Sequence, residues 1–462
     1  MTSEQVRSRA ALFVFASATL VFSLLFGRPG FVSADHSSSS RNASSSDSTP
    51  AQAASRPALD FSGTVPSREN ARLHLTTVLG SVVVHTHDST TVDYRVHLET
   101  DSTTKGAARL LESFQLRALP TDDGVSLKGE TLAKYPAGRL WVTISVTIPK
   151  NYSVDISTGG GNITTDDLNG RETLLTQGGN IATGNIGGGA RLTAVAGGHI
   201  TVKNVAGELV AETGGGHILT GTVSGNAFLH THGGHIRSDS ITGIAHLVTD
   251  GGNITLEHSG PSLVAETAGG QIQVGEAAGL VRAKTDGGGI RVVRSSGPAT
   301  LQAADGSIYL TQADGSVKAS TATGGITAWF ISPSKDSGDC ELQSANGDIV
   351  VYLGRTLPVT IDAQVQMGQT HGVIIDPAIP LAVKYDDTHG ERVARAEGAL
   401  NGGGEVLRLR TVAGNIRLVL SNAGEQRQLY RQQMEGLQQQ LNQLQSSLFP
   451  QSQRSSEASR QQ

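Results

Sequence analysis

A short phrase of two glycines, one variable residue and isoleucine returns along the middle of this chain at a nearly constant interval. The first copy is Gly160-Gly161-Asn162-Ile163, and later copies keep the isoleucine even where the glycines vary. Successive isoleucines are 18 residues apart, with one interval of 19, and they are Ile163, Ile181, Ile200, Ile218, Ile236, Ile254, Ile272, Ile290, Ile308 and Ile326. A period in this range is typical of a solenoid, in which each repeat buries its apolar side only against its neighbours.

Two further columns, meaning residues at the same position in successive repeats, share this register. A glycine follows most of the isoleucines by seven residues, and a threonine precedes most of them by five; the threonines are Thr158, Thr176, Thr213, Thr231, Thr249, Thr267, Thr285 and Thr321. Apolar and polar residues alternate, as in Ile254-Thr255-Leu256, which is the period of a strand with one buried face. The sequence predicts an all-β fold, a single-stranded β-helix or solenoid with about 18 residues per coil and a short C-terminal α-helix.

Glycine is expected to act in the turns of this solenoid. Each coil should hold two short strands with a glycine turn after each. Glycine suits these turns because it permits positive φ and because it lets one turn lie directly on the next.

The N-terminus has the layout of an export signal. Two arginines precede an apolar run over residues 10–26, and Val32-Ser33-Ala34 supplies small residues for cleavage after Ala34. This predicts a signal peptide over residues 1–34, with a membrane anchor formed by residues 10–26 as the alternative. The serine-rich residues 35–59 are expected to be a disordered linker. We therefore expect an exported protein of the periplasm, outer surface or extracellular space, or one anchored to the inner membrane.

The solenoid is predicted over residues 60–420. Its regular repeats occupy residues 154–330, and the less regular segments 60–150 and 339–420 are expected to cap its ends. Caps are needed because the outermost strands of a stack would otherwise expose unpaired edges that can aggregate. Within the first cap, the pattern predicts strands over 71–77, 81–87, 91–98 and 140–148 and a short helix over 105–114.

Residues 421–462 form a glutamine-rich tail with a heptad spacing of apolar residues. These are spaced alternately four and three apart, and they are Tyr430, Met434, Leu437, Leu441, Leu444 and Leu448. Three interpretations of the helix are open: it folds back on the end of the solenoid, it forms a homo-oligomer through these residues, or it lies at a membrane surface.

Composition narrows the classes of function. The chain has 57 Gly but only 10 Phe, 7 Tyr and 2 Trp, which disfavours an enzyme built on one large conventional core. A net charge of −5 does not favour a nucleic-acid partner. Cys340 is the single cysteine of the sequence, so an intramolecular disulfide and a cysteine-based zinc cluster are excluded. No cofactor is predicted.

Several segments carry a family resemblance. Val146-Thr147-Ile148-Pro149-Lys150, the following residues 154–163, and the later segments 357–363, 400–404 and 414–416 resemble a bacterial adhesin-like β-helix family of unknown function (the DUF4097 type). The resemblance covers roughly residues 60–420. It implies a single-stranded β-helix exported to the cell envelope, with no defined enzymatic site. This chain departs from the family in its serine-rich linker and glutamine-rich tail.

Three histidines share one column. His199, His217 and His235 should stack about 4.8 Å apart, and imidazole is a common metal ligand. A straight stack does not converge on one point as tetrahedral zinc requires, and Asn162 and Asn180 fill the same column elsewhere. The favoured interpretation is a structural polar ladder, and the weaker one is a metal site. His230, His232, His246 and His258 lie nearby in the sequence.

Carboxylates raise the question of catalysis, because glycoside hydrolases use two of them roughly 5 to 9 Å apart. Asp250 and Asp286 share a column two coils apart, and Glu212 and Glu266 share another three coils apart. No insertion interrupts the repeat beside them to form a cleft, so we favour a solvated face and predict no catalytic residues.

These observations predict a non-enzymatic exported β-solenoid, an adhesin-like or scaffold protein of the bacterial cell envelope, with a surface glycan or an envelope protein as partner. Two alternatives are a carbohydrate-active β-helix enzyme and an envelope assembly protein that multimerises through its C-terminal helix.

Overall fold

The computed structural model describes residues 56–102, 104–132, 138–330, 338–367, 370–388 and 391–448. All of them belong to one compact unit, Ser55–Gln462. The predicted signal segment and the predicted linker up to residue 55 lie outside the described residues.

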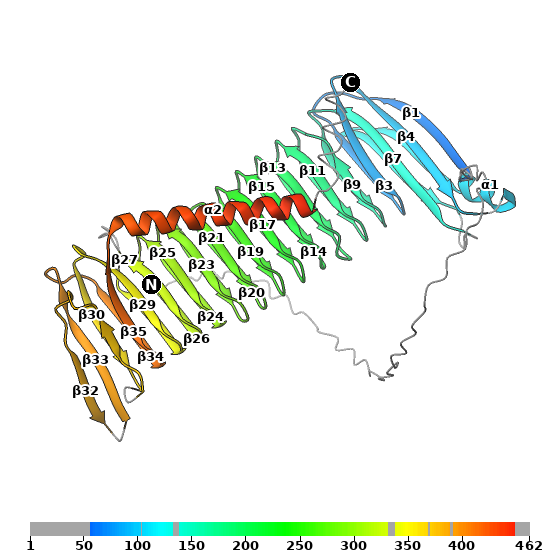
Figure 1. Ribbon diagram of the computed structural model, residues 1–462. Coiled ribbons are helices and arrows are strands. Elements are labelled where there is room, and N and C mark those ends of the chain that lie inside the picture. Colours follow the sequence, from blue (N-terminus) through cyan, green and yellow to red (C-terminus); the bar gives the residue numbers. More distant parts are fainter. Residues whose placement is uncertain are drawn as a thin grey trace, which may run out of the picture. The chain divides into compact units, whose positions relative to one another are not determined.

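The regular part is a stack of coils, each giving one strand to each of two parallel sheets (Figure 1). Sheet A contains β9 (Ile163–Thr165), β11 (Ile181–Ile186), β13 (Ile200–Val205), β15 (Ile218–Val223), β17 (Ile236–Ile241), β19 (Ile254–Ser259), β21 (Ile272–Ala277), β23 (Ile290–Ser295), β25 (Ile308–Ala313) and β27 (Ile326–Phe330). Sheet B contains β8 (Ser153–Thr158), β10 (Glu172–Thr176), β12 (Ala190–Ala194), β14 (Leu209–Thr213), β16 (Ala227–Thr231), β18 (Ile244–Thr249), β20 (Ser262–Thr267), β22 (Leu280–Thr285), β24 (Ala299–Asp305) and β26 (Val317–Thr323). The predicted β-solenoid is confirmed.

The strands pair in register, so that the columns of the sequence become ladders in space. Ile254 lies opposite Ile236 on one side and Ile272 on the other. Ile254 and Leu256 point inward and are fully buried, whereas Thr255 between them points outward. Burying a side chain of this size contributes roughly 1.5–3 kcal/mol, and the contribution recurs in every coil. The inward residues of the two sheets cover each other in one core, but a single coil contributes only one strand to each sheet, so the coils are stable only together.

The threonine column closes the glycine turns. The Oγ1 hydroxyl of Thr249 donates to the carbonyl oxygen of Gly234 at 2.8 Å and accepts from the amide of Gly252 at 3.1 Å. It therefore joins a turn to the turn of the preceding coil. The expectation that positive φ explains the glycines is wrong for most of them, since Gly252 has no such φ. The expectation that the turns need glycine in order to stack is confirmed, because a Cβ on Gly252 would meet the backbone of Gly234.

In the first cap, the order in which the strands stack differs from their order in the chain. β2 (Arg72–Thr77) and β3 (Ser81–His87) stack directly on β8 and β9, and the chain then runs outward before it returns to β8. The outer layers consist of β1 (Ala58–Pro66), β4 (Thr91–Thr100), β5 (Phe114–Thr121), β6 (Gly124–Thr131) and β7 (Leu140–Pro149), with α1 (Thr104–Glu112) between β4 and β5. β6 and β7 continue the parallel stack, and β1, β4 and β5 pair antiparallel outside them. β1 begins two residues before the predicted boundary at residue 60.

In the second cap, too, the stacking order of the strands differs from their order in the chain. β28 (Cys340–Asn346) and β29 (Ile349–Gly354) are followed in the stack by the last strands of the chain, β34 (Val406–Ala413) and β35 (Ile416–Ser421). The strands that precede these in sequence lie further out, and they are β30 (Val359–Val365), β31 (Val373–Ile375), β32 (Val383–Thr388) and β33 (Glu391–Leu400). Ile416 therefore stands opposite Ile349 in the isoleucine ladder although many residues separate them.

The C-terminal helix α2 (Ala423–Leu448) lies along sheet A and runs back over β25, β23 and β21 (Figure 1). The Nε2 amide of Gln426 donates to the carbonyl oxygen of Thr311 at 2.9 Å, and the Tyr430 hydroxyl donates to Glu276. Leu437 is buried against Gly275. The helix thus folds back on the solenoid, which was one of the three interpretations left open by the sequence. It packs on the side of the solenoid and not on its end. No helix among the described residues is long and apolar enough to cross a membrane.

Candidate functional site

The three histidines of the shared column form a stack beside the turn that leads into sheet A. The ring centroids of His199 and His217 are 4.9 Å apart, and those of His217 and His235 are 4.8 Å apart, with the rings nearly parallel. The Nδ1 atom of His199 accepts from the amide of His217 at 3.0 Å, and the Nδ1 atom of His217 accepts from the amide of His235 at 2.9 Å. Each ring therefore ties its own coil to the next.

This bonding selects one form of the imidazole. A nitrogen that accepts from a backbone amide carries no proton, so the neutral ring holds its proton on Nε2. Burial lowers the pKa of His217, and the neighbouring His235 and His199 lower it further. Asparagine accepts the same hydrogen bond from the next coil elsewhere in the column, since the Oδ1 atom of Asn180 accepts from the amide of His199 at 2.8 Å. The geometry is that of a structural ladder.

Whole coils of the stack separate the carboxylates that share a column in the sequence. Glu212 and Glu266 lie three coils apart in one outward row of sheet B, about 14 Å at the spacing of parallel strands. Asp250 and Asp286 are both exposed and stand two coils apart. Asp286 lines a shallow groove of about 420 Å³ with Lys284 and Gln302, and Asp250 is not part of that lining.

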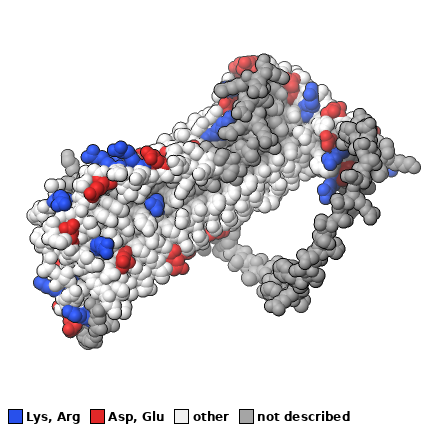
Figure 2. Space-filling model, in the orientation of Figure 1, with Lys and Arg blue, Asp and Glu red and all other residues white. Residues whose placement is uncertain are grey.

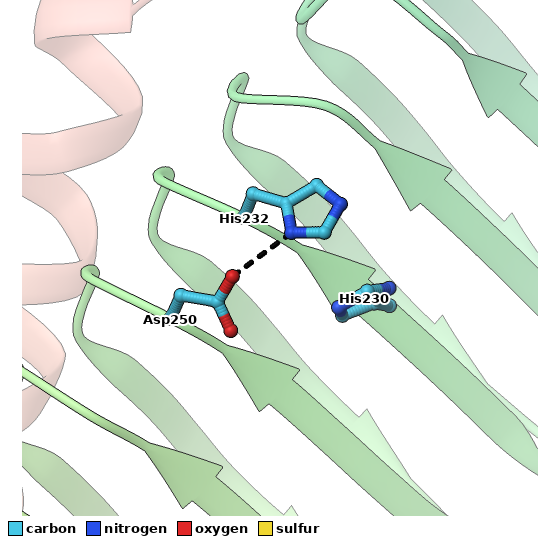
Figure 3. A group of neighbouring side chains, drawn as sticks. All are labelled: His230, His232 and Asp250. Carbon is cyan, nitrogen blue, oxygen red and sulfur yellow. Dashed lines mark hydrogen bonds and ion pairs between the residues drawn. The ribbon is translucent and has the colours of Figure 1, made fainter. Parts of the chain in front are cut away.

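Asp250 instead joins two histidines that the sequence did not select as a site. His230 is the last outward residue of β16, His232 follows the strand, and Asp250 occupies the His232 position of the next coil (Figure 3). The Nδ1 atom of His232 lies 2.9 Å from an Asp250 carboxylate oxygen. The His230 and His232 rings are 5.0 Å apart and inclined by 70°, and one ligand atom from each of the three residues lies within 4.8 Å of the others.

The signal for this cluster was present in the sequence. Residues i and i+2 at a strand end point to the same side, and the residue 18 further along returns to the same place one coil later. His230, His232 and Asp250 satisfy both conditions. The cluster was missed because His230 and His232 lie outside the more regular His199 column.

Shallow grooves follow the stacking direction on the surface of the coils. One of about 390 Å³ is lined by an amide row in which the Nδ2 atom of Asn185 donates to Asp167 at 2.9 Å and that of Asn204 donates to Asn185 at 2.7 Å. The backbone amide of Asn185 also donates to Asp167, at 2.8 Å, and this bond together with the side-chain bond holds the pKa of Asp167 below its usual range. On the face shown in Figure 2, acidic and basic side chains are interspersed over a largely uncharged surface.

One carboxyl group is buried inside the stack. The side chain of Glu172 is fully buried, and the Thr165 hydroxyl donates to its two oxygens at 3.1 and 3.2 Å. Desolvation raises the pKa of Glu172 to about 8, against the weaker lowering effect of the Thr165 hydrogen bonds. Because Glu172 faces the interior, it is suited to a structural role and not to contact with a ligand. Near the second cap, Cys340 and Phe330 line a cavity of about 50 Å³, which is too small for a drug-sized ligand.

No protein-family model and no curated protein matches the chain. Solved structures that resemble it include a "putative cell adhesion protein" from Clostridium sporogenes, at 7% identity over 79% of this chain and 100% of that one, with a TM-score of 0.19. A "putative adhesin" from Parabacteroides distasonis is 12% identical over 78% of this chain and 97% of that one, with a TM-score of 0.20. Another from Bacteroides fragilis is 11% identical over 78% and 97%, with a TM-score of 0.19. TM-scores this low establish neither a common fold nor a common function.

Proposed function

We propose that this protein is an exported, non-enzymatic, adhesin-like binding or scaffold protein of the bacterial cell envelope, and that it binds a repeating polymer such as a surface glycan. The observation that carries the proposal is the in-register stack, which presents similar outward positions at every coil. Lys284, Gln302, Ser320 and Gln343 are consecutive neighbours in one outward row of sheet B. All four line the groove of about 420 Å³.

A row of this kind favours a polymer over a single small molecule. The side chains recur about every 4.8 Å, and they combine one cation with neutral hydrogen-bonding groups, which suit hydroxyl-rich ligands. Each contact is weak and exposed to water. Several contacts to one chain raise the overall affinity, because every contact after the first is intramolecular. Export is supported by the signal-like layout of residues 1–34.

The test is retention on immobilised bacterial polysaccharides of graded length, with the supernatant analysed by mass spectrometry. We expect retention to increase with polymer length and no shortened product to be released. Replacing Lys284 and Gln302 by alanine should weaken retention. The matched control replaces Lys203 and Gln273 of sheet A, which removes the same side-chain types from the other sheet.

Two results would contradict the proposal. Equal retention of both double variants would show that the row does not bind the polymer. Release of shortened glycan that Asp250→Asn or Asp286→Asn abolishes would identify the carbohydrate-active enzyme instead.

A further inference from the structure

We propose that His230, His232 and Asp250 form a binding site for one divalent transition-metal ion of the zinc class. This site is independent of the proposed polymer binding. It is set by the coil geometry, which places ligand atoms of two imidazoles of one coil and a carboxylate of the next within 4.8 Å of one another (Figure 3).

The residue types fit such an ion. Zinc is bound in proteins by histidine nitrogen and carboxylate oxygen at about 2.0 to 2.2 Å, which places tetrahedral ligands about 3.4 Å from one another. The three ligand atoms here already lie within 4.8 Å of one another. The His232–Asp250 contact of 2.9 Å must open slightly, and each of the other two separations must close if it exceeds about 3.4 Å. Both changes need only rotation of side chains at a strand end and in the turns. Such a site leaves a fourth position for water or for an atom of a bound molecule.

The bonding state of the rings separates this cluster from the His199 column. In that column Nδ1 is occupied as an acceptor of a backbone amide. Within the described residues, His230 has no hydrogen bond through either ring nitrogen, and the only polar partner of His232 is Asp250. The His230 and His232 rings are inclined to each other, so their nitrogens can converge, whereas the parallel rings of the column cannot.

The cluster also places a negative charge where a cation would need it. Asp250 is exposed, and the one ion-pair partner that its carboxylate has among the described residues is the ring of His232. Two neutral imidazoles and one carboxylate leave a bound divalent ion with one net positive charge. The completed site would then attract an anionic group to the open position.

The repeat supplies variants that should fold. Val248 occupies the position of His230 one coil later, so His230→Val introduces a residue that the column already accepts. Ala268 occupies the position of Asp250 one coil later, because Thr267, which precedes it, pairs with Thr249. Asp250→Ala therefore also introduces a residue that the column already accepts. His246→Val is the matched control, because His246 is an exposed histidine of the same sheet whose next neighbour in the column is Val264.

The experiment is titration of the metal-free protein at pH 7.5 with Zn²⁺ by calorimetry and with Co²⁺ by visible absorption. We expect a cobalt spectrum of tetrahedral type in wild type. His230→Val and Asp250→Ala should weaken zinc binding by at least about tenfold, because loss of even an outer-shell partner costs 10–100-fold at known sites. His246→Val should bind as wild type does, and unchanged melting temperatures confirm that all variants fold.

Three outcomes would overturn the proposal. The first is the absence of a tetrahedral cobalt spectrum in wild type. The second is equal binding by His230→Val, Asp250→Ala and wild type. The third is loss of binding in a variant with His199, His217 and His235 replaced by asparagine while His230→Val retains it, which would place the ion in the His199 column.

Discussion

Gly252 lies so close above Gly234 in the stack that a Cβ atom on Gly252 would be 1.9 Å from the Gly234 carbonyl oxygen. A Cβ atom built on Gly251, its neighbour in the chain, would have no contact atom nearer than 3.9 Å. The two glycines of one phrase thus have different reasons to be there. The second is required by contact between coils, and the first is not required by any contact.

The first prediction follows from this difference. Gly252→Ala should lower the free energy of unfolding by several kcal/mol, because the backbones of two coils must move apart and break the ladder locally. Gly251→Ala should change it by less than about 1 kcal/mol. Urea unfolding followed by circular dichroism measures both. Similar losses in the two variants would show that contact between turns is not the reason for the second glycine.

Glu172 should make stability depend on pH between about 4.5 and 8. Its pKa is about 8 in the folded protein and 4.5 in the reference state, so the folded protein holds a proton that the unfolded chain releases between these values. Stability is therefore greatest below about pH 4.5, falls by up to about 1.4 kcal/mol per pH unit as pH rises from there to about 8, and levels off above 8. Glu172→Gln keeps the shape without the titration.

Melting temperatures at pH 7 and 8.5 test this prediction. Wild type should lose stability between these values, and Glu172→Gln should lose much less. Glu208→Gln, at an exposed position, serves as the control and should follow wild type. The prediction fails if Glu172→Gln and wild type fall by the same amount.

The histidine ladder should act in the opposite direction, below neutrality. The pKa of His217 is lowered in the folded protein, so the unfolded chain binds protons more readily and stability is lost as pH falls below about 6.5. Protonation of Nδ1 would also remove the acceptor for the next coil. Replacing His199, His217 and His235 by asparagine keeps an acceptor without a titrating group, as Asn180 shows.

We expect the triple asparagine variant to match wild type at pH 7.5 and to melt at a higher temperature than wild type at pH 5. His246→Asn, which changes a histidine outside the ladder, should retain the pH dependence of wild type. An equal decrease in wild type and the triple variant between pH 7.5 and pH 5 would count against the ladder as the cause.

The packing of α2 can be tested at one residue. Leu437→Asp places a charge in a buried contact and should release the helix, at a cost of roughly 1.5–3 kcal/mol of docking energy. Trypsin should then cut at the exposed Arg427 and Arg431 faster than in wild type. Gln439→Asp adds the same charge at an exposed position of the helix and should leave cleavage unchanged. Light scattering on both variants shows whether the freed heptad residues associate between chains, which is the predicted homo-oligomer.

The sequence by itself determined the repeated part of the molecule. Isoleucine and threonine in fixed phase leave each coil with an inner edge that only the next coil can cover, so the register follows from the columns. In the first cap, the predicted strands over 71–77, 81–87, 91–98 and 140–148 and the helix over 105–114 correspond to β2, β3, β4, β7 and α1. β1, β5 and β6 were not predicted.

Only the tertiary structure decided where distant segments meet. Ile416 lies beside Ile349, and α2 lies on sheet A, because contacts between segments far apart in the chain have no periodic signature. The same holds for the chemistry of the histidines. The column of His199 was visible in the sequence, but the bonding of Nδ1 to the next coil and the approach of His230, His232 and Asp250 depend on the few ångströms between neighbouring coils.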